Sequence, residues 1–106
     1  MGSSVADVAR GLEEAGADAI GANCGELAPA EMAVIAALYK EETSLPILIQ
    51  PNAGKPRLVQ GETIYDMPPD KYAEGVMQCL ESGASLIGGC CGTTLDHIKA
   101  VVRRVR

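Results

Sequence analysis

The sequence predicts an α/β fold in which three short strands alternate with helices in a parallel sheet. Apolar residues recur at helical spacing in four segments, and three short, almost uncharged runs separate these segments. In addition, residues 13–25 near the start of the chain can be aligned with residues 80–92 near its end. With 106 residues, the chain forms at most one small domain.

The first half of the chain predicts a helix, a strand and a second helix. The first helix is predicted over residues 4–15, where Ser4 and Asp7 have the spacing of a capping box. Residues 17–24 form a short apolar run, which is typical of a strand buried on both faces. The second helix is predicted over residues 28–42, and its apolar stripe contains Met32, Ile35, Ala36 and Tyr39.

The second half predicts two more strand and helix pairs, with strands over residues 45–52 and 84–90. Residues 53–67 show no sustained periodicity, and so long a connection is typical of a functional lid. The helix over residues 68–83 has Tyr72, Val76, Cys79 and Leu80 on its apolar side. A capping box of Thr93 and Asp96 predicts the last helix, whose apolar residues are Leu95, Ile98, Val101, Val102 and Val105.

The internal alignment places Gly21 on Gly88, Gly25 on Gly92 and Cys24 on Cys91. Two units of the same construction therefore deliver a thiol to the same end of the sheet, where parallel α/β folds bind their ligands. A closed barrel would bring these thiols together. The three consecutive βα units resemble the last three-eighths of a TIM (β/α)₈ barrel.

Composition narrows the classes of function. The net charge of −5 and the presence of only three aromatic residues argue against nucleic acid as a partner. No apolar run reaches the ~18 residues of a membrane span, so we expect a cytoplasmic protein that does not enter a membrane. In a reducing compartment, four cysteines point to metal binding or catalysis rather than to disulfides.

Cys24, Cys90 and Cys91 form a soft ligand set that suits Zn²⁺ and leaves the fourth tetrahedral position open. Two other interpretations of the adjacent pair stay open: an inert buried pair, or a redox dithiol with a Cys90–Cys91 disulfide. Cys79 lies on an apolar helix stripe and is expected to be a packing residue. His97 lies outside the apolar stripe of the last helix and is expected to be solvated.

The segments "GANCG" (21–25), "QPNAG" (50–54) and "GGCCGTT" (88–94) resemble the homocysteine S-methyltransferases. That family includes betaine–homocysteine methyltransferase and the homocysteine-binding domain of cobalamin-dependent methionine synthase. The resemblance implies a zinc ion held by Cys24, Cys90 and Cys91, which takes the homocysteine sulfur as its fourth ligand. It also implies that residues 1–106 are the C-terminal part of a barrel domain that transfers a methyl group to homocysteine and gives methionine.

The resemblance implies several partners. The methyl donor is methylcobalamin or methyltetrahydrofolate, betaine or S-methylmethionine, and the bacterial methionine-synthase type, with a corrinoid module as partner, is favoured. The glycine-rich opening strand of the family has no counterpart in this sequence, so an N-terminal barrel part or further copies of the chain are expected partners. Asn23 and Asn52 stand at strand ends, where an amide either hydrogen-bonds a substrate or caps a turn, and contact with the substrate is the prediction that we favour. The competing class is a non-catalytic, zinc-stabilised barrel fragment that self-associates.

Overall fold

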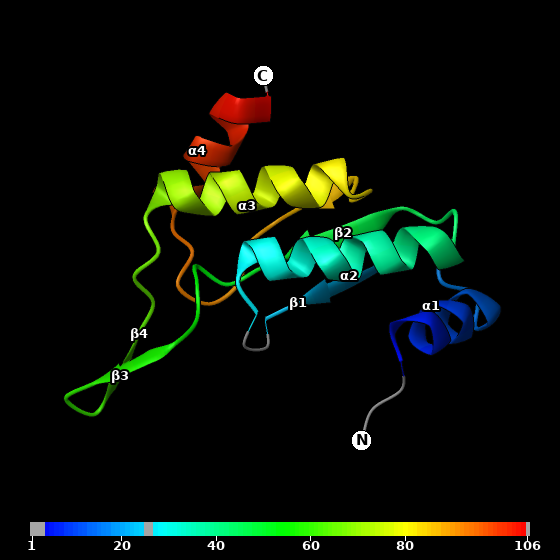
Figure 1. Ribbon diagram of the computed structural model, residues 1–106, viewed down its shortest axis with the longest axis horizontal. Helices are drawn as coiled ribbons and strands as arrows, with labels where there is room; N and C mark the ends of the chain where they lie inside the picture. Colours follow the sequence, from blue (N-terminus) through cyan, green and yellow to red (C-terminus); the bar gives the residue numbers. More distant parts are fainter. Residues whose placement is uncertain (1–3, 25–26, 106) are drawn as a thin grey trace.

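The computed structural model describes residues 4–24 and 27–105, which form a layer of helices on one face of a parallel sheet (Figure 1). The overlay of Gly25 on Gly92 thus falls partly outside the described residues. The elements are α1 (Val5–Glu14), β1 (Ile20–Asn23), α2 (Pro29–Glu42), β2 (Ile47–Gln50), β3 (Arg57–Val59), β4 (Glu62–Ile64), α3 (Pro69–Glu81), β5 (Leu86–Ile87) and α4 (Leu95–Val105). Their order confirms the predicted alternation of strand and helix.

The parallel sheet has the strand order β1-β2-β5. Ile20 pairs with Ile47, and Ile49 pairs with Ile87, so the three strands run in step and end at the same edge. Helices α2 and α3 cover one face of the sheet, and the molecule measures only 18 Å along its shortest axis (Figure 1). This thickness corresponds to one sheet and one layer of helices.

The core lies between the sheet and the helices. Its strand residues Ile20, Ile47 and Ile49 are buried against a cluster of helix side chains that includes Met32, Ala36, Tyr39 and Cys79. A second cluster contains Ala53, Tyr72, Ala73, Val76, Ala100 and Val101, and Ile87 packs against both clusters. The predicted apolar stripes of α2 and α3 therefore face the core, as expected from helical periodicity.

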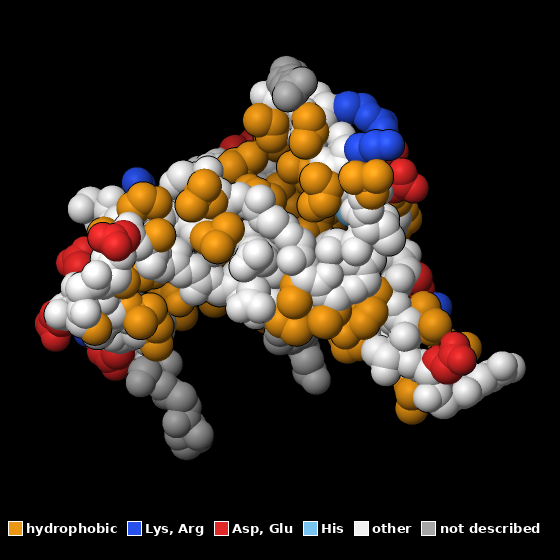
Figure 2. Space-filling model, turned by 180° about the vertical axis from the view of Figure 1, so that it is seen from behind, with side chains coloured by type: hydrophobic (Ala, Val, Ile, Leu, Met, Phe, Trp, Pro, Cys, Tyr) orange, Lys and Arg blue, Asp and Glu red, His pale blue; other side chains and the backbone are white. Residues whose placement is uncertain are grey.

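The prediction that residues 17–24 form a strand buried on both faces is wrong for the described part of the chain. Asn23 at the end of β1 is exposed, and Leu86 in β5 is 49% exposed. These side chains belong to the sheet face opposite α2 and α3, which no described helix covers. Figure 2 shows this side of the molecule, where apolar side chains also gather on α4 at the top of the view.

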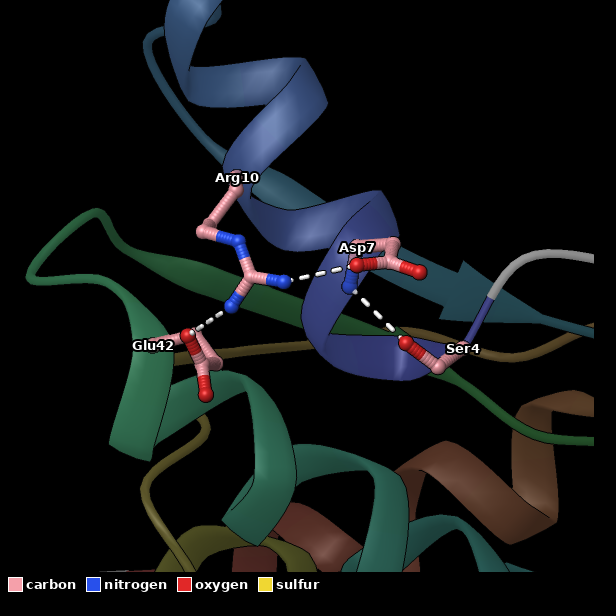
Figure 3. Close-up of polar contacts among 4 residues, drawn as sticks. All are labelled: Ser4, Asp7, Arg10 and Glu42. Carbon is pink, nitrogen blue, oxygen red and sulfur yellow. Dashed lines mark hydrogen bonds and ion pairs between the residues drawn. The ribbon is translucent and has the colours of Figure 1, made fainter.

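Helix α1 begins as the capping box predicts, because the Ser4 hydroxyl accepts a hydrogen bond of 3.1 Å from the Asp7 backbone N–H (Figure 3). Arg10 forms ion pairs with Asp7 at 2.6 Å and with Glu42 at the end of α2 at 2.9 Å. The side chain of Arg10 is half exposed, so these pairs orient α1 more than they stabilise it. None of the described helices is long and apolar enough to cross a membrane.

Residues 53–67 contain a hairpin that the sequence pattern does not predict. Strands β3 and β4 pair in antiparallel fashion around Gln60 and Gly61, whose φ angles are 49° and 82°. Two successive positive φ angles are the mark of a type I′ turn, which matches the twist of a two-stranded hairpin. The hairpin projects away from the body of the molecule (Figure 1), and Leu58 on it is 76% exposed.

The start of α4 and the environment of His97 also differ from prediction. The residue that precedes α4 is Thr94, not the predicted Thr93. The backbone N–H of Thr94 donates to His97 Nδ1 at 3.1 Å. Because Nδ1 accepts, Nε2 carries the proton and donates to the carbonyl oxygen of Met67 at 2.7 Å. His97 is only 7% exposed and lies edge-on against Tyr72, so the expectation of a solvated histidine is wrong.

Candidate metal centre

The three candidate thiols lie at the carboxyl edge of the parallel sheet, as predicted. Cys24 follows the last residue of β1, and Cys90 and Cys91 lie in the loop after β5. All three sulfur atoms lie within 4.8 Å of one another, and Cys24 Sγ is 3.6 Å from Cys91 Sγ. The predicted site residues therefore form one cluster from two strand ends that are 66 or more positions apart in the sequence.

Cys24 has an unusual backbone. Its φ angle of 58° lies in the left-handed region, which a residue with a side chain rarely adopts. The conformation is held because the Cys24 N–H donates to the carbonyl oxygen of Gln50 at 3.2 Å. This turn at the end of β1 directs the sulfur toward the loop after β5, and strain of this kind is common at functional sites.

The loop after β2 is hydrogen-bonded to the loop after β5, which carries the adjacent cysteines. The N–H of Cys90 donates to the carbonyl oxygen of Pro51 at 3.1 Å, and the N–H of Ala53 donates to that of Cys91 at 2.9 Å. Between these bonds, the side-chain oxygen of the fully buried Asn52 accepts from the Cys91 N–H at 3.1 Å. The two loops are thus joined by three hydrogen bonds around the sulfur atoms.

The electrostatic environments of the thiols differ. The neighbouring Cys24 thiol lowers the pKa of Cys90 most, burial opposes this, and Asn23 and Cys91 lower the pKa further. The amide nitrogen of Asn23 lies 3.8 Å from Cys90 Sγ. Burial raises the pKa of Cys79 to about 11, and its thiol donates to the carbonyl oxygen of Pro29. Cys79 is therefore a packing residue outside the cluster, as predicted.

The donor set fits a zinc ion. With Zn–S bonds of ~2.3 Å and tetrahedral angles, two ligand sulfurs lie about 3.8 Å apart. The contact of 3.6 Å between Cys24 and Cys91, and the limit of 4.8 Å for the whole cluster, are close to this spacing. Three thiols on partly buried side chains also leave one side of such a site open to a further ligand.

Comparison with known proteins agrees with this geometry. The sequence profile of the family described as "Homocysteine S-methyltransferase" matches residues 1–105. The chain belongs to the homocysteine S-methyltransferase family. Two mycobacterial relatives named methionine synthase align over 106 residues and 99% of this chain, with 39% identity in Mycobacterium leprae and 38% in Mycobacterium tuberculosis. Homocysteine S-methyltransferase 4 of Zea mays is 33% identical over 84% of the chain.

A solved structure shares the fold. The crystal structure of the homocysteine methyltransferase MmuM from Escherichia coli, in an oxidised form, superposes on 97% of this chain with a TM-score of 0.70 and 31% identity. The chain spans 9% of the length of the two mycobacterial proteins, 27% of the maize protein and 30% of the Escherichia coli protein. It therefore corresponds to part of a homocysteine S-methyltransferase domain, and its alternating βα units match part of a TIM-barrel structure.

Glycines let the family's cysteine loop turn tightly around the thiols. Gly92 has a φ angle of 78°, and a Cβ on Gly89 would lie 2.5 Å from the Thr93 hydroxyl. That hydroxyl donates to the carbonyl oxygen of Cys90 at 2.7 Å. The segment "GGCCGTT" thus folds as one compact turn. In this turn the Thr93 hydroxyl holds Cys90, so the prediction that Thr93 caps the last helix is wrong.

Two tyrosines belong to the site's surroundings and were missed as such. The Tyr72 hydroxyl donates to the carbonyl oxygen of Gly88 at 3.0 Å, and burial raises its pKa to about 12. Tyr65 follows the β3–β4 hairpin and packs on the cysteine loop, since a Cβ on Gly92 would lie 2.2 Å from Tyr65 Cβ. Tyr72 was identified only as a core residue, and no periodicity marked Tyr65, so the sequence carried no signal for either contact.

Proposed function

We propose that this chain supplies the zinc-binding edge of a homocysteine S-methyltransferase, with Cys24, Cys90 and Cys91 as the metal ligands. The observation that carries the proposal is the convergence of three thiol sulfurs within 4.8 Å at the carboxyl edge of the sheet. Ligands of parallel α/β folds collect at this edge. The family membership and the soft donor set both support zinc.

A zinc ion held by these thiols would bind the homocysteine sulfur and favour its thiolate form, the nucleophile that accepts the methyl group and becomes methionine. The chain's own residues hold the ligands in place. Cys24 is fixed by its strained turn, and Cys91 is fixed by Asn52. Asn23 is exposed beside Cys90 Sγ, and we propose that it contacts the polar groups of the substrate.

Asn52 is proposed as a second substrate contact, although its side-chain oxygen already accepts from the Cys91 N–H. The rest of the barrel is proposed to come from a longer protein, a separate N-terminal part or another copy of the chain, because the relatives are several times longer. The similarity to two proteins named methionine synthase favours a methyl donor of the bacterial methionine-synthase type. A corrinoid module is then the proposed partner, and the cytoplasm is the proposed location.

A second candidate is a zinc-stabilised fragment that assembles without catalysis. The observation that favours it is the exposed apolar surface on β5 and α4, which includes Leu86, Leu95 and Val105. Such surface is unusual for a self-sufficient small domain. Both candidates share the same metal ligands and differ in whether homocysteine binds.

Homocysteine binding tests the choice. A barrel reconstituted from this chain and the absent strands, supplied as a fusion or a second chain, is loaded with zinc and studied by zinc X-ray absorption. We expect the number of sulfur neighbours to rise from three to four when homocysteine is added, with release of a proton near neutral pH. A sulfur count that stays at three while calorimetry records binding would exclude activation of the thiol by the metal. Loss of binding altogether would favour the assembly candidate.

A further inference from the structure

Hydrogen bonding between β2 and β5 continues past the ends of these strands, into the loop that carries the adjacent cysteines. The N–H of Gly88 donates to the carbonyl oxygen of Ile49 at 3.0 Å. Two residues further along each strand, the N–H of Cys90 donates to the carbonyl oxygen of Pro51 at 3.1 Å. A step of two residues on both sides is the pattern of a parallel ladder. The backbone of Cys90 is therefore placed by a continuation of the sheet.

Pro51 interrupts this ladder because proline has no backbone N–H. In a parallel ladder, a residue that accepts from one neighbour on the next strand directs its own N–H to the carbonyl oxygen two residues before that neighbour. The carbonyl oxygen of Pro51 accepts from Cys90, so the N–H of residue 51 would be directed to the carbonyl oxygen of Gly88. Proline removes that ladder bond.

The Tyr72 hydroxyl takes the place of the missing donor. Its oxygen lies 3.0 Å from the carbonyl oxygen of Gly88 and 3.3 Å from that of Pro51. A carbonyl oxygen can only accept, so the hydroxyl donates, and its single proton is shared between the two acceptors. Tyr72 thereby joins the ends of β2 and β5 at the point where the proline leaves their ladder open.

Packing fixes the hydroxyl at this point. Tyr72 lies in the first turn of α3 and is fully buried. Its ring packs edge-on against His97 in α4, with 5.3 Å between the ring centroids, and His97 donates to the carbonyl oxygen of Met67 at 2.7 Å. Ala53 in the loop after β2 belongs to the same buried cluster as Tyr72. The hydroxyl is thus held from two helices, outside the loops that it joins.

We propose that Tyr72 is a positioning residue for the thiol of Cys90, because its hydroxyl completes the ladder between β2 and β5 at Pro51 and so fixes the backbone that carries this thiol. The inference rests on the proposed function, since it concerns one of the proposed zinc ligands. Groups that support metal ligands without binding the metal typically change its affinity about 10- to 100-fold when they are lost.

Binding of Co²⁺ by the full chain tests the proposal. Tyr72→Phe removes the hydroxyl and keeps the ring, so chelator competition should show about 10-fold weaker binding. Pro51→Ala supplies a backbone N–H where the ladder lacks one. Combined with Tyr72→Phe, it should restore most of the lost affinity, whereas alone it should give no gain because the hydroxyl already fills this place. Tyr39→Phe is the matched control, since its hydroxyl donates to the carbonyl oxygen of Gly21 within β1 at 3.1 Å, and it should match the parent.

Unchanged affinity of Tyr72→Phe, or a loss that Pro51→Ala does not reverse, would overturn the proposal, because a backbone donor cannot repair a defect in ring packing. Failure of the parent chain to bind Co²⁺ would refute the proposed function, and hydrogen exchange of the metal-free, reduced protein then decides the role of Tyr72. There, Tyr72→Phe should accelerate exchange of the Cys90 N–H about 10-fold more than that of the Ile20 N–H, which is bonded to Pro46 at the start of β1. Equal changes at both amides would show that Tyr72 does not position Cys90.

Discussion

Each cysteine of this chain lies in an environment that sets its reactivity. Cys90 receives hydrogen bonds from neighbouring groups that lower its pKa, whereas Cys79 is fully buried and its pKa is raised to about 11. A thiolate is the reactive form of cysteine, and a lower pKa increases its fraction at a given pH. The two thiols should therefore respond very differently to an alkylating reagent.

The prediction concerns the metal-free, reduced chain. As the pH rises from 6, Cys90 should be alkylated at a lower pH than an ordinary cysteine. In the folded protein, Cys79 should stay unmodified up to about pH 9. Peptide mapping by mass spectrometry after short exposures measures both rates. Cys79 in urea serves as the control for intrinsic reactivity. Equal rates for the two cysteines in the folded chain would contradict the structure.

At the residue scale, the sequence was informative where residue type and strand position agreed. The internal alignment of Cys24 with Cys91 was enough to place three thiols at one edge, because parallel strands end together. The burial of His97 could not be predicted, since its partner Met67 lies 30 positions away in a segment without periodicity. The packing of Tyr65 against Gly92 was equally hidden, because Tyr65 lies in the same segment without periodicity.

Among the elements, α4 is tied to the rest of the molecule by the side chain of His97. His97 caps the Thr94 N–H at the start of the helix and ties Met67 to it. The helix boundary was nevertheless predicted within two residues, because Leu95 to Val105 keep a helical apolar pattern. The hairpin was missed because strands of three residues with exposed side chains leave no alternating pattern, and only Gln60-Gly61 marked the turn.

Replacing His97 by alanine should destabilise the protein. The variant loses hydrogen bonds at both ring nitrogens and leaves a small cavity against Tyr72, so we expect a loss of about 2–3 kcal/mol in the free energy of unfolding. Lys99→Ala, at an exposed position of the same helix, should change it by less than about 0.5 kcal/mol. Urea titration followed by circular dichroism measures both. Similar stabilities for the two variants would show that His97 does not anchor α4.

The whole molecule has one covered and one largely open sheet face. Leu86 on the edge strand is 49% exposed, and Leu95, Val102 and Val105 on α4 are 68%, 41% and 58% exposed. The predicted barrel segment accounts for this surface, since further strands and helices would cover it. The strand pattern and the helix stripes report which residues are apolar and not which neighbours are present, so the exposure could be predicted only from the inference that the chain is part of a barrel.

The isolated chain should therefore self-associate through this surface. Double substitution Leu95→Glu/Val105→Glu should lower the mass measured by light scattering at a given concentration, because charge in the contact opposes association. Val34→Glu is the matched control, since Val34 is 59% exposed on α2, away from α4 and the open sheet face. A monodisperse monomer with cooperative unfolding would show that the chain is self-sufficient.

If thiols from two strand ends form one zinc site, the zinc content of the purified protein depends on all three of them. In protein purified without chelator, elemental analysis should give one zinc ion per chain, both for the parent and for Cys79→Ser. Cys24→Ser should lose the metal although the adjacent pair Cys90 and Cys91 is intact, because Cys24 supplies the ligand from the other strand end. Retention of stoichiometric zinc by Cys24→Ser, or a parent chain without zinc, would show that the three thiols do not form one zinc site.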